Sequence, residues 1–388
     1  MAKRAAQSAL SQPMLFGDSP AARLAGVIGP AEPSPQLRQL GSRVPGSVHL
    51  GTSSWSFPGW GPLVWDRPVS EQTLARSGLA AYAAHPLFRT VGLDRTFYAP
   101  MPEHELADLA AMTPPGFRML IKAHQAITRP TADERGRTFG PTGAAAGKTA
   151  TNPLFLDAAY AVDRVIGPAV LGLKDRLGPI VFQFPPLDLS ANGPTGGVEA
   201  FTDRVEEFLA RLPAGPVGPA GIHPLYAVEV RNRELLTPRW RRMLRRHNAV
   251  AALAGHPSQP TVAAQASLLR PLDAPEGVPP PRALVVRWLL HPTQDYAAAK
   301  AKYDPFTRLV DAHPQARNEI SDLVVRAVLA GLPAWVVINN KAEGSAPLSV
   351  AALAETIAAA LAACGPGGAP ASDAGGSDAG EGPAAVTG

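Results

Sequence analysis

Cysteine is nearly absent from this chain of 388 residues, and its scarcity excludes two kinds of site. Cys364 has no second cysteine with which to form a disulfide, and a cysteine-based metal site needs several thiolates. The nine histidines show no HExxH or similar metal-binding spacing. We therefore expect no metal site, and the sequence identifies no cofactor. This cysteine usage fits a reducing compartment, and we predict a cytoplasmic protein.

Long apolar runs and dense charge are also lacking. No segment approaches about 18–20 consecutive apolar residues, which predicts no contact with a membrane. The N-terminus has basic residues without the apolar core of a secretory signal. Charged residues make up only 18%, and the net charge is +4. Five arginines between 239 and 246 decorate one predicted helix, and we interpret them as a solvated outer face rather than a nucleic-acid patch.

Composition divides the chain into a core and two tails. Residues 1–45 lack apolar periodicity, and residues 365–388 are of low complexity, so we predict that both segments are disordered. The remaining segment, 46–364, alternates short apolar runs with helical patterns and is expected to be a single domain.

Eight short apolar segments predict strands, most of them rich in β-branched or aromatic residues and bounded by Gly, Pro or Asn. They are Val48–Ser54, Phe88–Asp94, Phe117–Lys122, Pro179–Phe184, Leu225–Arg231, Ala249–Ala254, Ala283–Leu289 and Pro333–Asn339. Helical patterns lie near 70–85, 103–112, 156–176, 199–211, 237–247, 315–330 and 349–363. This alternation predicts a single α/β barrel of the (β/α)8 TIM type, with a doubly wound open sheet as the alternative.

Two connecting segments, 123–155 and 255–282, are unusually long and are expected to be functional lids or disordered insertions. The first contains a near match to a phosphate-binding P-loop at 142–149. That motif needs a glycine in place of Thr142 and a strand before it, and ERGRTFGP is no strand. We interpret the match as a surface loop.

Polar residues recur where the predicted strands end, which is where a TIM barrel carries its chemistry. Glu229 and Arg231 lie two apart on one strand and so share a face, and an ionised pair is poorly tolerated against an apolar helix layer. We place both inside the barrel mouth. The predicted catalytic residues are Glu229, Lys122 and Asp94, and the predicted substrate-binding residues are Arg231, Arg287, Gln183, Asn339, Trp55 and Tyr98.

At these same residues the chain resembles the YecE-like family, also known as domain of unknown function 72. Six motifs carry the resemblance, in the family's order between about 47 and 360. They are GTSSWSFPGW at 51–60, Thr96-Phe97-Tyr98 with Pro100, Lys122, Gln183-Phe-Pro-Pro186, Val228-Glu-Val-Arg231 and the segment from Asn339 to Pro347. The resemblance implies a TIM barrel and no established reaction. This member is divergent: Gly92 replaces an acidic residue, Arg129 replaces a histidine, and the segment from Arg287 to His291 is altered.

Three functions remain open. The first is an enzyme acting on a small anionic substrate, phosphorylated or sugar-like, with Glu229 as acid or base and the cations as anion ligands. Lys122 is an alternative nucleophile that would form a Schiff base. The second is a binding protein without catalysis that recognises a metabolite or a nucleic-acid phosphate. The third is a structural or interaction protein with a degenerate site, in which the same charges form an internal salt-bridge network. The sequence does not indicate an oligomeric state.

Overall fold

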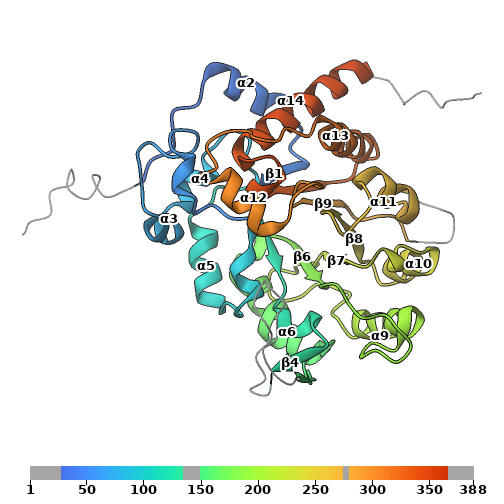
Figure 1. Cartoon of the computed structure of the whole chain (residues 1–388). Helices are drawn as coiled ribbons and strands as arrows, with labels where there is room; N and C mark the ends of the chain where they lie inside the picture. Colours follow the sequence, from blue (N-terminus) through green and yellow to red (C-terminus); the bar gives the residue numbers. More distant parts are fainter. Residues whose placement is uncertain (1–27, 134–148, 274–278, 366–388) are drawn as a thin grey trace, which may run out of the picture.

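The predicted strands close into a barrel of eight parallel strands, surrounded by helices (Figure 1). The computed structural model describes residues 28–133, 149–273 and 279–365. Around the barrel the order is β1, β2, β3, β6, β7, β8, β9 and β10, and β10 pairs with β1. The strands are β1 Val48–Thr52, β2 Thr90–Leu93, β3 Arg118–Lys122, β6 Leu177–Gln183, β7 Tyr226–Glu229, β8 Val250–Gly255, β9 Leu284–Trp288 and β10 Ala334–Ile338. The TIM-type barrel is confirmed, and the open sheet is wrong.

The helices form the outer layer. They are α2 Pro35–Arg43, α3 Glu71–Ser77, α4 Leu79–Ala83, α5 Glu103–Ala111, α6 Gln125–Thr128, α7 Ala158–Ala161, α8 Gly167–Leu173, α9 Gly197–Ala210, α10 Pro238–Arg246, α11 Val262–Leu269, α12 Tyr296–Tyr303, α13 Pro314–Leu329 and α14 Ala346–Cys364. The helix expected over 156–176 is divided by a π-helical turn at Val162–Ile166. Thr237 caps α10 by accepting the Trp240 N–H, and Pro238 follows at the first helical position.

The apolar core has two parts, separated by the barrel wall. One lies between the strands and the helices, and the other fills the barrel interior. Strand side chains alternate between these two regions. Residues two positions apart on a strand point to the same side of the sheet. A polar residue two positions after an interior apolar residue is therefore expected to point into the barrel mouth. These interior residues are Leu120, Val181, Ala227, Val285 and Val337, and they precede Lys122, Gln183, Glu229, Arg287 and Asn339.

The expected disorder of residues 1–45 is wrong for 28–45. Residues 35–43 form α2, capped by Ser34, and Figure 1 shows this helix beside α14. The guanidinium of Arg89 donates hydrogen bonds to the carbonyls of Gly41 at 2.9 Å and Val44 at 3.0 Å. This helix has few apolar residues, so its sequence shows no helical periodicity of apolar residues. The rest of the two predicted tails, 1–27 and 366–388, lies outside the described residues.

Both long connections contain regular structure. The first holds α6 and a two-stranded hairpin of β4 Thr131–Asp133 and β5 Thr149–Thr151. The second holds α11, whose N-terminus is capped by Thr261. Of the P-loop-like segment only Thr149 is described, and 142–148 lies outside the described residues.

Helix α14 is long and apolar enough to cross a membrane by length and composition, with a mean hydropathy of 1.7. The sequence expectation missed it because Glu355 interrupts the apolar run. The residues Val350, Leu353 and Ile357 are buried in the core between strands and helices. A core helix of a barrel passes the same test, so this finding is weak evidence for a membrane span.

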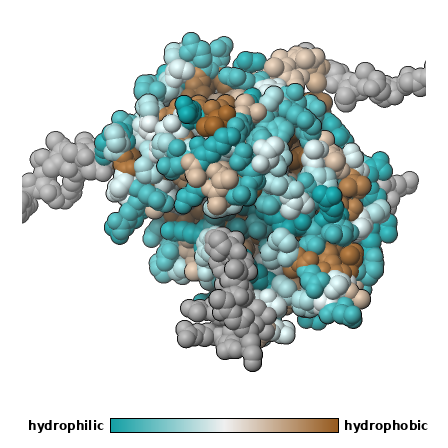
Figure 2. Space-filling model, in the orientation of Figure 1, coloured by the Kyte–Doolittle hydropathy of each residue, from teal (hydrophilic) through white to brown (hydrophobic). Residues whose placement is uncertain are grey.

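The arginines of α10 are largely engaged with the protein itself. Arg239 pairs with Glu199 and Asp203 of α9, and Arg246 pairs with Glu206. Arg245 is buried and donates to backbone carbonyls at Pro271 (2.9 Å) and Asp273 (2.8 Å). Figure 2 shows one face of the molecule as mostly hydrophilic, with separate apolar patches. The arrangement favours an outer helix face over a phosphate-binding surface.

Candidate functional site at the barrel mouth

Glu229 is the centre of the polar cluster at the mouth. It is the last residue of β7 and is 0% exposed. Its Oε2 atom lies 2.6 Å from Arg287 Nη1, and its Oε1 atom lies 2.6 Å from Arg231 Nη2. Burial alone would raise the pKa of the Glu229 carboxyl, but Arg231 and Arg287 outweigh it and lower that pKa. Glu229 is therefore a fixed carboxylate that holds two arginines.

Arg287 connects this carboxylate to two neighbouring strands. Its Nη1 atom donates to Gln183 Oε1 at 3.0 Å, and its Nη2 atom donates to Asp94 Oδ1 at 3.3 Å. Burial opposes the charge, but Glu229 and Asp94 together raise the pKa of Arg287. Four predicted residues, Asp94, Gln183, Glu229 and Arg287, therefore meet in one network built from β6, β7, β9 and the end of β2.

Arg231 has unused hydrogen-bonding capacity, as does Arg287 through its buried Nε atom. Its side chain is buried, and Glu229 is its one ion-pair partner within the described part of the chain. Its Nη1 atom is buried and has no hydrogen-bond partner among the described residues. A guanidinium presents donors in a planar fork that matches carboxylate and phosphate oxygens. Arg231 can therefore donate a hydrogen bond to an anion while it keeps its ion pair with Glu229.

Lys122 lies at the end of β3, with its Nζ atom 3.8 Å from the centre of the Phe97 ring. Within 28–133, 149–273 and 279–365 this amine has no hydrogen bond or ion pair. Burial lowers the pKa of Lys122 to about 8, and Asp94 offsets part of that shift. Near neutral pH the amine is thus charged in most molecules and neutral in the rest, which suits it to anion binding and to nucleophilic or proton-transfer chemistry.

A second lysine, Lys341, was missed by the sequence reasoning. It follows β10 in a 3-10 turn, and its Nζ atom lies 4.2 Å from the centre of the Tyr296 ring. Burial lowers the pKa of Lys341 to about 8, and Asp94 partly opposes that shift. Asn339 accepts the Lys341 backbone N–H at 3.0 Å, so it acts as the turn residue that positions this lysine. Lys341 lies in a 3-10 turn, where the alternation of extended backbone no longer holds, and this is why it was not predicted.

Two of the predicted aromatic residues differ in position. Tyr98 is 49% exposed and packs edge-on against Phe97. The Phe97 ring also contacts the amine of Lys122. Burial and Asp94 raise the pKa of the Tyr98 hydroxyl. Trp55 is buried, and its indole N–H donates to the carbonyl of Leu74 in α3 at 2.9 Å. The structure brings Tyr98 to the mouth and leaves Trp55 in the core between strands and helices.

Positive charge exceeds negative charge in this cluster. Its buried cations are Lys122, Arg231, Arg287 and Lys341, and its carboxylates are Asp94 and Glu229. No group of three or more His, Cys, Asp or Glu side chains in the described ranges is arranged to hold a metal ion. The electrostatics of the mouth therefore suit an anion.

Two of the comparisons with known proteins found matches. A family model described as "Protein of unknown function DUF72" matches residues 49–373. The chain belongs to this family. A DUF72 family protein from Enterococcus faecalis has a TM-score of 0.46 and 14% identity, covering 81% of this chain and 95% of that chain. Another, from Thermotoga maritima, has a TM-score of 0.45 and 16% identity, covering 81% and 99%. The sequence matches no curated protein.

The resemblance to the family led us to expect departures from its pattern at Gly92, Arg129 and His291, and all three lie in the described structure. A Cβ atom at Gly92 would lie 3.1 Å from the Ser53 carbonyl oxygen, a tight contact that a small shift of the neighbouring backbone would have to relieve. Arg129, where a histidine is usual, lies 5.9 Å from the centre of the Phe97 ring. His291 instead faces His313, with 5.2 Å between the ring centres.

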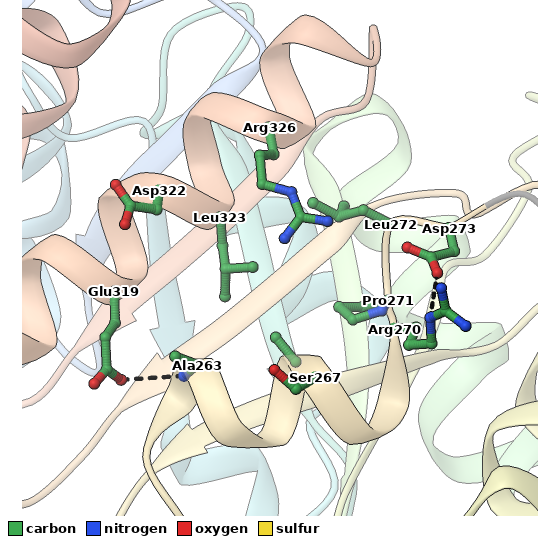
Figure 3. A pocket seen from close by; sticks show the side chains of 11 residues that line it. Ala263, Ser267, Arg270, Pro271, Leu272, Asp273, Glu319, Asp322, Leu323 and Arg326 are labelled. Carbon is green, nitrogen blue, oxygen red and sulfur yellow. Dashed lines mark hydrogen bonds and ion pairs between the residues drawn. The ribbon is translucent and has the colours of Figure 1, made fainter. Parts of the chain in front are cut away.

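A cavity of about 440 Å³ lies away from the mouth, between α11 and α13 (Figure 3). None of the predicted site residues lines it. Arg270 Nε pairs with Asp273 Oδ2 at 2.5 Å, and Glu319 Oε2 accepts the Ala263 N–H at 3.1 Å. Its lining carries two arginines and three acidic residues, so it lacks the positive excess of the mouth.

Proposed function

We propose that the barrel mouth binds a small anionic molecule, phosphorylated or sugar-like, and that the protein acts on it as an enzyme. The observation that carries this proposal is the charge of the mouth, where four buried cations face two carboxylates. Like charges held together out of water repel, and a bound anion relieves that repulsion. Arg231 and Lys122 are the proposed anion ligands, because each has hydrogen-bonding groups left unused by the described residues.

The roles of the remaining residues follow from their contacts. Glu229 has both oxygens in ion pairs and a lowered pKa, so we assign it to positioning Arg231 and Arg287 rather than to proton transfer. For a substrate that bears a carbonyl group, Lys122 is the proposed reactive group in place of its role as an anion ligand, which then falls to Arg231. Its neutral amine is suited to attack a substrate carbonyl and, with loss of water, form an imine, or else to accept a proton.

The alternative is a binding protein without catalysis, for a metabolite or a nucleic-acid phosphate. Borohydride reduction in the presence of a carbonyl-bearing sugar phosphate separates the two cases. An imine on Lys122 would be trapped as a stable mass increase, which Lys122→Met would abolish. Binding without any such adduct favours the non-catalytic alternative or the proton-transfer role.

Thermal unfolding with added anions tests the proposed site. A ligand that binds only the folded state stabilises it by about 2.7 kcal/mol at 100 times its dissociation constant. Ribose 5-phosphate and small dicarboxylates should raise the melting temperature above that in matched chloride. Arg231→Met and Lys122→Met should reduce this gain, and exposed Lys174→Met serves as the control. Equal melting temperatures in all anions would leave the internal salt-bridge network as the better explanation.

A further inference from the structure

The ion pair between Arg287 and Asp94 crosses the barrel mouth and divides it into two sides. Asp94 follows β2, Arg287 belongs to β9, and Nη2 of Arg287 lies 3.3 Å from Oδ1 of Asp94. Around the closed barrel, β1 and β10 lie on one side of this pair, and β3, β6, β7 and β8 lie on the other. Arg231 follows β7 and pairs with Glu229, the last residue of that strand. The anion site proposed at Arg231 therefore uses only one side of the mouth.

The side formed by β1 and β10 has a free polar group of its own. Val337 faces the barrel interior, and the pairing of β10 with β9 continues to Asn339, whose N–H donates to the Trp288 carbonyl at 2.8 Å. The backbone of Asn339 is extended, with φ −96° and ψ 149°, so its side chain points into the mouth, two positions after Val337. Its Oδ1 atom accepts the Lys341 N–H at 3.0 Å, and its Nδ2 atom has no hydrogen-bond partner among the described residues. Asn339 therefore presents an unused amide donor on this side.

Lys341 adds a positive charge beside this amide. Its Nζ atom lies 3.5 Å from Asn339 Oδ1, and the residue is 7% exposed. No carboxylate of the described residues forms an ion pair with it, and the ring centre of Tyr296 lies 4.2 Å from the amine. Tyr296 is itself 58% exposed, so the amine lies one side chain below the surface. An ammonium group without a counterion, next to an amide donor, forms a second place for an anion.

Asp94 determines what can connect the two places. Its side chain is 33% exposed, and Oδ1 is its one oxygen that has a partner among the described residues. A ligand that reaches from Arg231 to Lys341 must pass over this carboxylate. An ionised carboxylate accepts hydrogen bonds from hydroxyl groups and repels negative charge. The middle of such a ligand should therefore be neutral and hydroxylated, with its negative charge at the two ends.

We propose that the ligand of the barrel mouth is a sugar or polyol that carries an anionic group at each end. Arg231 binds one anionic group, and Lys341 and Asn339 bind the other. The inference rests on the proposed function for the first anion, and it adds a second subsite and the substrate class. Lys341 is the residue that distinguishes a ligand with two anionic groups from a ligand with one.

Isothermal titration of the full-length protein tests this inference. The probe is glucose 1,6-bisphosphate, and glucose 1-phosphate and glucose 6-phosphate are matched ligands with the same ring and one phosphate. The bisphosphate should bind about tenfold or more tightly than either monophosphate. Lys341→Met should remove most of that preference and change the affinity for the monophosphates much less. Lys300→Met removes the same charge from an exposed position on α12, the helix of Tyr296, and should keep the preference.

A second ligand tests the role of Asp94. Hexane-1,6-diyl bisphosphate has two terminal phosphates and no hydroxyl groups between them. It should bind more weakly than glucose 1,6-bisphosphate, because it offers no hydrogen bond to the Asp94 carboxylate. An equal or higher affinity for the hexane compound would overturn the hydroxylated middle of the proposed ligand.

A second variant guards against misfolding of the first. Asn339→Asp keeps the oxygen that accepts the Lys341 N–H but replaces the amide donor with a negative charge. It should weaken binding of the bisphosphate more than binding of the monophosphates, and both variants should keep a cooperative thermal transition. Equal affinities for the bisphosphate and the monophosphates, or a preference that survives Lys341→Met, would overturn the inference and leave the proposed function intact. Absence of binding by all of these phosphates would overturn both.

Discussion

The Oε2 atom of Glu229 lies 2.6 Å from Arg287 Nη1, and both side chains are buried within the barrel. The same carboxylate holds Arg231 at 2.6 Å through its other oxygen. One acid on β7 thus fixes two cations that come from different strands. Loss of this acid would leave two guanidinium groups buried side by side.

Glu229→Gln should lower the free energy of unfolding by about 3–5 kcal/mol, because it leaves buried cations without their counterion. Urea denaturation at neutral pH measures this change. Glu229→Gln combined with Arg287→Met should cost less than the sum of the single substitutions. Asp203→Asn, in the exposed pair with Arg239, is the control and should cost less than about 1 kcal/mol. Strict additivity of the two mouth substitutions would contradict a coupled network.

Lys122 should make stability depend on pH in the alkaline range. Burial lowers its pKa from 10.5 to about 8, so between these values the unfolded chain binds more protons than the folded one. The free energy of unfolding therefore rises as the pH increases from about 8 to about 10.5. Below pH about 8 the amine is charged in the folded protein, and the whole cost of burying that charge is present. Lys122→Met should stabilise the protein at pH about 7, and this gain should shrink toward pH about 10. Urea unfolding at the two pH values checks the sign, with Lys174→Met as a control whose effect stays constant.

Anion affinity should decrease as the lysines of the mouth lose their protons, whereas protein stability increases. Lys122 and Lys341 both have a pKa lowered by burial to about 8, so the positive charge of the mouth decreases as pH rises through that value. Titration of ribose 5-phosphate should show weaker binding at pH about 9 than at pH about 7. The phosphate is already dianionic across this range, and the arginines stay charged. Lys122→Met should bind more weakly at neutral pH and depend less on pH, whereas a profile unchanged by this substitution would exclude Lys122 as an anion ligand.

The N-terminal boundary of the domain makes a further prediction. Arg89 donates to carbonyls of Gly41 and Val44, and α2 lies beside α14. A chain that starts at residue 46 should unfold at lower urea than one that starts at residue 28, since it loses α2 and leaves the Arg89 donors without these acceptors. Equal urea midpoints for the two chains would show that α2 adds nothing to stability.

The fold was predictable because the barrel strands are short, apolar and separated by helical patterns. Alternation along each strand then predicts which polar residue at its end points into the barrel mouth. The rule put Lys122, Gln183, Glu229 and Arg287 in one region, where the structure has them. It also placed Arg231 beside Glu229, two residues further along the same chain segment.

The rule fails once the backbone leaves the extended conformation. Lys341 lies in a turn after β10, so no periodicity says which way its side chain points. Trp55 shows the converse: an aromatic residue near a strand end faced the helix layer instead of the mouth.

The apolar residues inside the barrel determine how a ligand can enter and leave the mouth. Leu120, Val181, Val285 and Val337 are fully buried beneath the ion pairs and close the described barrel from below. A molecule that reaches Arg231 must therefore leave by the opening through which it entered. For the proposed enzyme, arrival of substrate and departure of product would therefore alternate, and a slowly released product would act as a competitive inhibitor.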